Sequence, residues 1–170
     1  MSGCCSTAQD AACSRPETNV GSCPACKQNG RLVATRTVKN LVCDHTRVAA
    51  AATYYFCRTP ECAVVYFSDE GTFHKSDIKV RVGIKEQEDP IPLCYCFDYT
   101  RADVSHDLAL RGHTDIPALV KAEVQRGFCA CDVKNPSGAC CLGDLARAIQ
   151  QIKSDRQVMA SPEEIEGEDS

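Results

Sequence analysis

Six cysteines lie between residues 94 and 141, in the segments Cys94-Tyr95-Cys96, Cys129-Ala130-Cys131 and Asn135-Pro136-Ser137-Gly138-Ala139-Cys140-Cys141. Cysteine rarely clusters unless its sulfur chemistry is used, and the rest of this stretch has the pattern of a small helical domain. Four thiolates that come from separate turns are the ligands that an iron–sulfur cluster requires. This half of the chain is therefore predicted to hold a [2Fe-2S] cluster.

The helical pattern comes from apolar residues that recur at spacings of three and four. Thr100 is expected to cap a first helix, with Asp103 as its capping-box partner and Gly112 as its end. A second amphipathic helix is predicted over 116–124. A third is expected to begin at Cys140-Cys141, where the free N–H groups and the positive dipole end of a helix favour thiolate sulfur and an anionic cluster.

Two closely spaced cysteine pairs precede that half, at Cys23-Pro24-Ala25-Cys26 and at Cys57-Arg58-Thr59-Pro60-Glu61-Cys62. Strands rich in β-branched and aromatic residues are predicted over 31–38, 53–57 and 63–67. Each pair puts two sulfurs on one turn, and a sheet would bring the two turns together, which is typical of a zinc ribbon. A closed, structural Zn²⁺ site is therefore predicted at Cys23, Cys26, Cys57 and Cys62.

A strand and a linker are expected between these two halves. Alternate residues over 78–84 are aliphatic, which predicts a half-buried strand, and the run 85–92 that follows is rich in charge and proline. The chain is thus expected to have the α+β class, with a small zinc-ribbon-like β module followed by a small helical [2Fe-2S] domain. The expected parts are a flexible cysteine-containing tail (1–21), the β module (22–89), the helical domain (90–153) and an acidic disordered tail (154–170).

The composition argues against several classes of protein. Fourteen cysteines in 170 residues would suit a secreted disulfide scaffold, but the chain begins with no basic or apolar signal region. No apolar run approaches the length of about 18 residues that a membrane span needs, and a net charge of −4 disfavours nucleic-acid binding. We expect a cytoplasmic protein with reduced or metal-bound thiols, no membrane insertion and no nucleic-acid partner.

Several cysteines fall outside the two predicted zinc pairs and the six-cysteine stretch. Cys4, Cys5 and Cys13 lie in a tail rich in Ser and Ala, where capture of a soft metal ion and incidental exposure are two open interpretations. Cys43, two residues before His45, is expected to be a buried or half-buried thiol and not a metal ligand. The histidines expected at the surface are His74, His106 and His113.

Six segments in combination form a pattern more specific than any one of them. They are Cys23-Pro24-Ala25-Cys26, Phe56-Cys57 to Cys62, Val64-Val65-Tyr66-Phe67, Arg81-Val82-Gly83 with Lys85-Glu86, Cys94-Tyr95-Cys96, and Cys131 to Cys141 with its Asn135-Pro136-Ser137-Gly138 turn. The pattern resembles the N-terminal domain of the iron–sulfur copper chaperone CopZ family over roughly residues 22–153. The second half is also similar to the bacterioferritin-associated-ferredoxin type of [2Fe-2S] domain.

The resemblance implies a ligand set for each metal. It implies zinc at Cys23, Cys26, Cys57 and Cys62, and the [2Fe-2S] cluster at Cys94, Cys96, Cys131 and Cys141. Spacing alone leaves Cys129 and Cys140 open as alternatives to the two later cluster ligands. The choice of Cys131 rests on its place four residues before Asn135, and that of Cys141 on the second place of the Cys-Cys pair.

Two main functions follow from the resemblance. The first is metal trafficking, in which the cluster supplies single electrons that convert Cu(II) to Cu(I), with a copper-transporting ATPase or a separate copper-loop protein and a redox partner as partners. The sequence has no M-x-C-x-x-C copper loop, so we expect Cu(I) to be held by the cysteine tail or by such a partner. The second is electron transfer or regulation of the ferredoxin type without copper.

A third hypothesis treats both metals as structural elements of a protein-interaction module. No nucleophile motif, phosphate-binding glycine loop or HExxH occurs in the chain. No enzymatic activity beyond electron transfer or metal reduction is therefore expected. An open site of two or three thiolates in the N-terminal tail would distinguish trafficking from the other functions.

Overall fold

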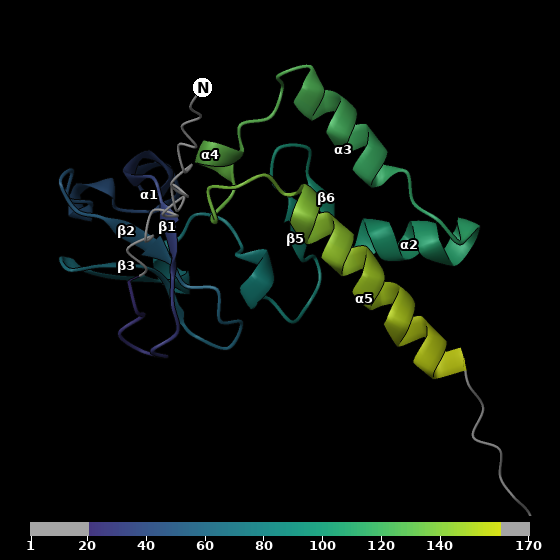
Figure 1. Ribbon diagram of the computed structural model, residues 1–170, viewed down its shortest axis with the longest axis horizontal. Helices are drawn as coiled ribbons and strands as arrows, with labels where there is room; N and C mark the ends of the chain where they lie inside the picture. The colour runs from purple at the N-terminus through teal and green to yellow at the C-terminus, as the bar shows by residue number, and fades with distance from the viewer. Residues whose placement is uncertain (1–20, 161–170) are drawn as a thin grey trace, which may run out of the picture.

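The computed structural model describes residues 21–160 and has the expected α+β class, with a sheet half (21–89) followed by a largely helical half (90–160) (Figure 1). The cysteine tail and the acidic end at 161–170 lie outside the described residues. Within the described residues, no helix is both long and apolar enough to cross a membrane.

An antiparallel sheet with the strand order β1-β2-β3-β4 forms the centre of the sheet half. Its strands are β1 (Arg31–Val33), β2 (Tyr54–Phe56), β3 (Val64–Ser68) and β4 (Gly71–His74). The strands predicted over 53–57 and 63–67 are therefore confirmed. The strand predicted over 31–38 was wrong beyond Val33, because the chain turns there into helix α1 (Thr35–Leu41).

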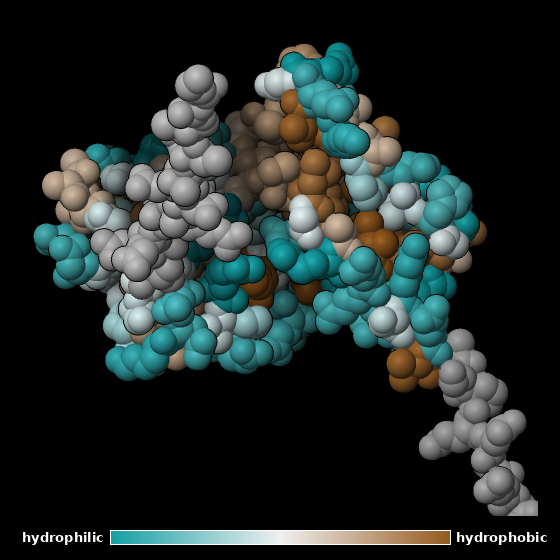
Figure 2. All heavy atoms as spheres, viewed as in Figure 1, coloured by the Kyte–Doolittle hydropathy of each residue, from teal (hydrophilic) through white to brown (hydrophobic). Residues whose placement is uncertain are grey.

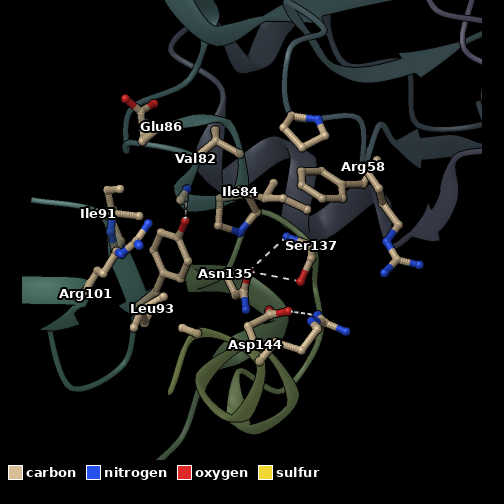
Figure 3. A pocket seen from close by; sticks show the side chains of 18 of the residues that line it. Arg58, Val82, Ile84, Glu86, Ile91, Leu93, Arg101, Asn135, Ser137 and Asp144 are labelled. Carbon is tan, nitrogen blue, oxygen red and sulfur yellow. Dashed lines mark hydrogen bonds and ion pairs between the residues drawn. The ribbon is translucent and has the colours of Figure 1, made fainter. Parts of the chain in front are cut away.

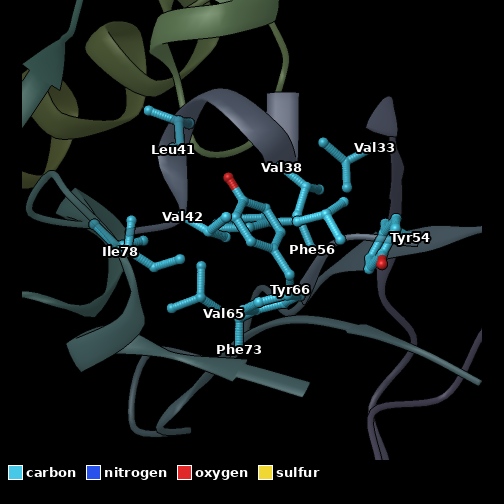
Figure 4. Packing of buried hydrophobic residues seen from close by; sticks show 12 residues of the cluster. Val33, Val38, Leu41, Val42, Tyr54, Phe56, Val65, Tyr66, Phe73 and Ile78 are labelled. Carbon is cyan, nitrogen blue, oxygen red and sulfur yellow. The ribbon is translucent and has the colours of Figure 1, made fainter. Parts of the chain in front are cut away.

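Helix α1 forms against the β-branched character of its sequence because its buried face packs on the sheet. Thr37, Val38 and Leu41 are buried on that face, and Figure 4 shows Val38 and Leu41 beside the aromatic side chains of the strands. Burial of apolar area outweighs the small intrinsic preference of Thr and Val for strands. The same cluster contains Phe56 and Tyr66, whose ring centroids lie 6.0 Å apart.

The strand predicted over 78–84 was also wrong. Ile78 forms only an isolated bridge with Val42, and the segment ends in the short 3-10 helix η3 (Gly83–Lys85). Ile78 and Val82 are nevertheless buried in the sheet-half core, with Val80 partly buried against it. The alternating pattern therefore correctly indicates that one face of this segment is buried. The segment buries that face against the core without pairing with a neighbouring strand.

The helical half begins with a hairpin of β5 (Pro92–Cys94) and β6 (Tyr99–Thr100) and continues through α2 (Arg101–Arg111), α3 (Ile116–Gln125), α4 (Cys131–Lys134) and α5 (Leu142–Ala160). The predicted capping box is confirmed, since Thr100 and Asp103 exchange side-chain-to-backbone hydrogen bonds and Gly112 adopts the left-handed C-cap at φ +72°. Helix α5 runs through Ala160, past the boundary expected at 153.

The helices of this half enclose a second core. Its buried members come from α2, α3 and α5 and include Val104, Val120 and Leu145, together with Cys94 and Cys141. Figure 2 shows apolar side chains gathered beside α3. Leu119 in this helix and Phe128 shortly after it are both exposed. Because Cys94 and Cys141 belong to this second core, both residues are buried among apolar side chains.

The two halves interlock through α1 and α4. The Thr37 hydroxyl donates to the carbonyl of Asp132, and Arg36 forms an ion pair of 2.7 Å with the Asp132 carboxylate. Gly138 adopts φ +64°, and a side chain there would press against Val33 and Thr37. The turn that precedes the last two cysteines is therefore fixed on the sheet half.

Candidate metal centres

The first centre is built by two turns at one end of the sheet. The turn that carries Cys23 and Cys26 is closed by hydrogen bonds of 2.9 Å between Cys23 and the backbone of Lys27 and Gln28. Lys27 takes the left-handed conformation at φ +61°, which turns the chain sharply after Cys26. Cys57 and Cys62 bound the connection between β2 and β3, where the Cys62 N–H donates to the carbonyl of Thr59.

The four sulfurs of this centre all lie within 4.8 Å of one another. The Sγ atoms of Cys23 and Cys62 are 3.9 Å apart, and those of Cys26 and Cys57 are 3.7 Å apart. A tetrahedral Zn²⁺ with Zn–S bonds of about 2.3 Å requires sulfurs roughly 3.8 Å apart. The predicted residues therefore have the number, type and spacing of donors that a closed zinc site requires.

The environment separates the pKa values of these thiols. A hydrogen bond from the Thr59 hydroxyl, helped by the backbone of Gln28, lowers the pKa of Cys26 to about 6. Burial raises the pKa of Cys62 to about 12 and also raises that of Cys23. A bound dication would favour the thiolate form of all four, because only the thiolate is a metal ligand.

The second centre gathers four cysteines from three separate segments of the helical half, namely the β5–β6 hairpin, the start of α4 and the residue before α5. Cys94 ends β5, Cys96 lies in the hairpin turn, Cys131 begins α4 and Cys141 directly precedes α5. Their sulfurs form two close pairs: Cys94 and Cys141 at 3.2 Å, and Cys96 and Cys131 at 3.6 Å.

Two thiol pairs are the arrangement that a [2Fe-2S] cluster requires, because each of its two irons takes two cysteine sulfurs. Backbone N–H groups also point at these sulfurs. The Ala130 N–H donates to the Cys96 sulfur at 3.2 Å, and the N–H groups of Cys96 and Phe97 face the Cys94 sulfur. Such N–H donors stabilise negative charge on sulfur and tune the potential of a cluster.

The surroundings also shift the pKa values of three thiols in this centre. The hydrogen bond with the Cys141 thiol lowers the pKa of Cys94 to about 6 and raises that of Cys141. Burial raises the pKa of Cys131 to about 12. The Cys94–Cys141 pair thus holds one thiol that keeps its proton and one sulfur that readily loses it.

The two alternative ligands occupy different surroundings. Cys140 is exposed and Cys129 is half-buried, and within the described residues no hydrogen bond joins either of them to another sulfur. Cys43 is exposed, so the expectation of a buried or half-buried thiol was wrong there. His74, His106 and His113 are exposed, as expected.

Two residues that the sequence analysis quoted within the family pattern, but to which it gave no role, make contacts between the two centres. Lys85, expected in a linker, is only 5% exposed, and Tyr95 lies between two of the cysteines of the second centre. A cavity of about 370 Å³ opens between the two halves beside them, and its lining includes Val82, Gly83 and Tyr95 (Figure 3). Nothing in the run 85–92 distinguishes Lys85 from the charged residues around it, so sequence reasoning offered no signal for its burial.

Comparison with known proteins gives three related findings. The CopZ-type zinc binding domain family model matches residues 20–79. The copper chaperone CopZ of Archaeoglobus fulgidus is 34% identical over 125 residues, which are 74% of this chain and 60% of that protein. The X-ray structure of the N-terminal domain of the same protein superposes with a TM-score of 0.62 at 34% identity, over 75% of this chain and 96% of that domain. The chain therefore spans about 60% of the length of its curated relative.

Proposed function

This chain belongs to the CopZ copper chaperone family, and from that premise we propose that it is a two-centre metalloprotein that supports copper trafficking by one-electron reduction. In this proposal Cys23, Cys26, Cys57 and Cys62 hold a structural Zn²⁺. A [2Fe-2S] cluster is held by Cys94, Cys96, Cys131 and Cys141.

The observation that carries the proposal is the convergence of the second set of cysteines. Cys94 meets Cys141 across 47 positions of sequence, and Cys96 meets Cys131 across 35. Three segments bring these four thiols together in two pairs, and three of the four are buried. Apolar packing alone does not require that the buried side chains be thiols in close pairs. This supports a resident cluster over four independent structural thiols.

The zinc centre has a different role. All four donors are protein thiolates, so a tetrahedral ion there would have no open position for a substrate. The four cysteines belong to a small buried cluster with Val64 and Phe67, and a metal would fix both turns against the sheet. We therefore assign zinc to structure and copper chemistry to the helical half.

A bound [2Fe-2S] cluster would supply one electron at a time. The protein residues hold the sulfurs in place, direct backbone N–H groups at them and bury Cys94, Cys131 and Cys141 from water. Reduction of Cu(II) would give Cu(I), the ion that thiolates prefer. We place this activity in the cytoplasm, because thiols that act as metal ligands must remain reduced.

The copper ion itself would be the cargo. The tail cysteines Cys4, Cys5 and Cys13, which lie outside the described residues, are one proposed Cu(I) site. The other is a separate copper-loop protein, with a copper-transporting ATPase as the acceptor and a redox partner as the electron donor.

The experiment that tests the proposal is metal and sulfide analysis of anaerobically purified protein, with absorption spectra before and after dithionite. About two irons, two sulfides and one zinc per chain are expected from the ligand sets. A Cu(I) titration of the wild type and of a Cys4→Ser/Cys5→Ser variant then tests the tail. Protein with zinc but no iron would overturn the cluster assignment.

A second candidate is electron transfer of the ferredoxin type without copper binding. Three cysteines of the described residues lie outside the two proposed ligand sets: Cys43, Cys129 and Cys140. Within the described residues no hydrogen bond joins any of them to another sulfur, and this favours the second candidate. The described part of the chain thus offers no evident two-thiol Cu(I) site. Tight Cu(I) binding that the tail variant abolishes would exclude this alternative.

A further inference from the structure

Lys85 donates two hydrogen bonds to the loop that carries half of the zinc centre. Its Nζ atom lies 2.7 Å from the carbonyl oxygen of Thr59 and 3.0 Å from that of Cys62. Both acceptors belong to the Cys57–Cys62 connection, and one of them is the carbonyl of a predicted zinc ligand. Lys85 therefore fixes the position of this loop from outside the sheet.

The charge of Lys85 needs an explanation, because a buried ammonium is expensive to remove from water. Within the described residues no carboxylate forms an ion pair with it, although the residue is only 5% exposed. A Zn²⁺ ion with four thiolate ligands carries a net charge of −2. The dianionic centre next to the Cys62 peptide would offset the buried positive charge.

The backbone that carries Lys85 is itself held firmly. Its carbonyl oxygen accepts a hydrogen bond from Lys75 Nζ at 3.1 Å. The neighbouring Glu86 carboxylate forms ion pairs of 2.9 Å with both Lys75 and Arg81. The Lys85 N–H also donates to the carbonyl of Val82 at 2.7 Å, which closes η3.

The other end of η3 is joined to the second centre by Tyr95. The Gly83 N–H donates to the Tyr95 hydroxyl at 2.8 Å, and that hydroxyl donates to the carbonyl of Arg81 at 3.0 Å. Tyr95 stands between Cys94 and Cys96, so its side chain fixes the turn that presents both thiols.

Backbone packing strengthens the same junction. A methyl group at Gly83 would overlap the carbonyl oxygen of Pro92, in the strand that ends at Cys94. Only glycine allows η3 and β5 to approach this closely. A continuous series of contacts therefore connects the zinc-site loop with Cys94. It runs from the Cys62 carbonyl to Lys85, through η3, and on to Tyr95 and Pro92.

We propose that Lys85 and Tyr95 are positioning residues that couple the two metal centres, so that zinc and the [2Fe-2S] cluster each raise the stability of the other. This inference rests on the proposed function, because it requires the cluster. By linkage, the factor by which the cluster tightens zinc binding equals the factor by which zinc stabilises the cluster. Zinc would then do more than hold the sheet half together.

The test compares zinc affinity in two forms of the full chain. Apoprotein is reconstituted either with zinc alone or with zinc, iron and sulfide, and zinc is titrated away with a fluorescent chelator while the visible absorption reports the cluster. We expect the apparent zinc affinity to be at least about fivefold higher in the cluster-loaded form. In the reverse direction, zinc-loaded protein should lose its visible absorption more slowly when an iron chelator is added.

Two substitutions test whether Lys85 and Tyr95 carry the coupling, and two others are controls. Lys85→Met and Tyr95→Phe each remove the polar group of the connection and keep most of the side-chain volume, so the affinity ratio should fall toward one. Lys79→Met is the matched control, since Lys79 Nζ also donates to a carbonyl, that of Asn40, away from both centres. Tyr54→Phe is the second control, since the Tyr54 hydroxyl accepts from the Ala49 N–H in the sheet half.

The possible results distinguish failure of the cluster assignment, failure of the coupling and failure of the role of Tyr95. Absence of iron and sulfide from the reconstituted wild type would overturn the proposed function and this coupling together. Cluster-loaded protein with an affinity ratio of one would overturn the coupling alone. A ratio that survives in Tyr95→Phe would remove Tyr95 from the path, and this variant decides the question even if Lys85→Met fails to fold.

Discussion

The Tyr66 hydroxyl donates a buried hydrogen bond of 2.7 Å to the carbonyl oxygen of Pro136, 70 positions further along the chain. Tyr66 lies in the middle of β3 and is fully buried, and Pro136 belongs to the turn that precedes Cys140 and Cys141. One side chain of the sheet half thus positions the loop that delivers the last predicted cluster ligand. The two halves are joined at this point, although their sequences read as separate modules.

Tyr66→Phe should destabilise this junction. The substitution leaves the buried Pro136 carbonyl without its donor, which should lower the free energy of unfolding by about 1–3 kcal/mol. Urea unfolding followed by circular dichroism measures the change, and the visible absorption reports whether the cluster is lost earlier in the transition. Tyr54→Phe removes a comparable hydroxyl that accepts from Ala49, so it should leave the cluster signal in step with unfolding.

Stability should fall at alkaline pH because of the same residue. Burial raises the pKa of Tyr66 far above its usual value, so the hydroxyl stays protonated in the folded protein while it ionises in the unfolded chain. The unfolded state then binds fewer protons, and the free energy of unfolding decreases by about 1.4 kcal/mol per pH unit above roughly pH 10. Wild type should lose stability more steeply than Tyr66→Phe between about pH 10 and pH 11.5; equal slopes would contradict the assignment.

Cys57→Ser should release the metal of the first centre. The serine hydroxyl is a poor substitute for a thiolate, so zinc content should fall from about one per chain to near zero. Because the binding free energy of a structural zinc is folding free energy, the sheet half should lose its cooperative unfolding transition. Elemental analysis and circular dichroism measure the two effects. Cys43→Ser is the matched control, since Cys43 is exposed and outside both centres, and its zinc should be retained.

Cys131→Ser should abolish or shift the visible absorption of the purified protein, whereas Cys129→Ser should leave it largely intact. The reason is geometric, since the Cys131 sulfur lies 3.6 Å from that of Cys96 while no hydrogen bond joins Cys129 to a sulfur within the described residues. Cys141→Ser and Cys140→Ser form a second pair with the same expectation. Equal losses within either pair would show that the ligand choice is wrong.

Features governed by neighbouring residues could be predicted well from the sequence. The Thr100 capping box and the Gly112 helix end are both present. The four zinc-site cysteines also come together as their spacing indicates. Each of these features depends on hydrogen bonds or dihedral preferences that act over a few residues.

Features that depend on distant contacts were missed. Residues 35–41 form a helix because Val38 and Leu41 pack on the sheet and Thr37 reaches the carbonyl of Asp132. The alternating segment 78–84 stays outside the sheet, since it buries Ile78 and Val82 without a strand partner beyond one bridge. In both places tertiary packing overrode local propensity.

The sequence by itself determined which cysteines could serve as ligands and approximately where α2, α3 and α5 begin. Only the tertiary structure decided how the thiols pair, why Tyr66 meets Pro136 and why Lys85 is buried. The ammonium of Lys85 can leave water because carbonyl groups 23 and 26 residues earlier lie in hydrogen-bonding position around it. Burial of a charge is a property of such remote neighbours, and no pattern of adjacent residues encodes it.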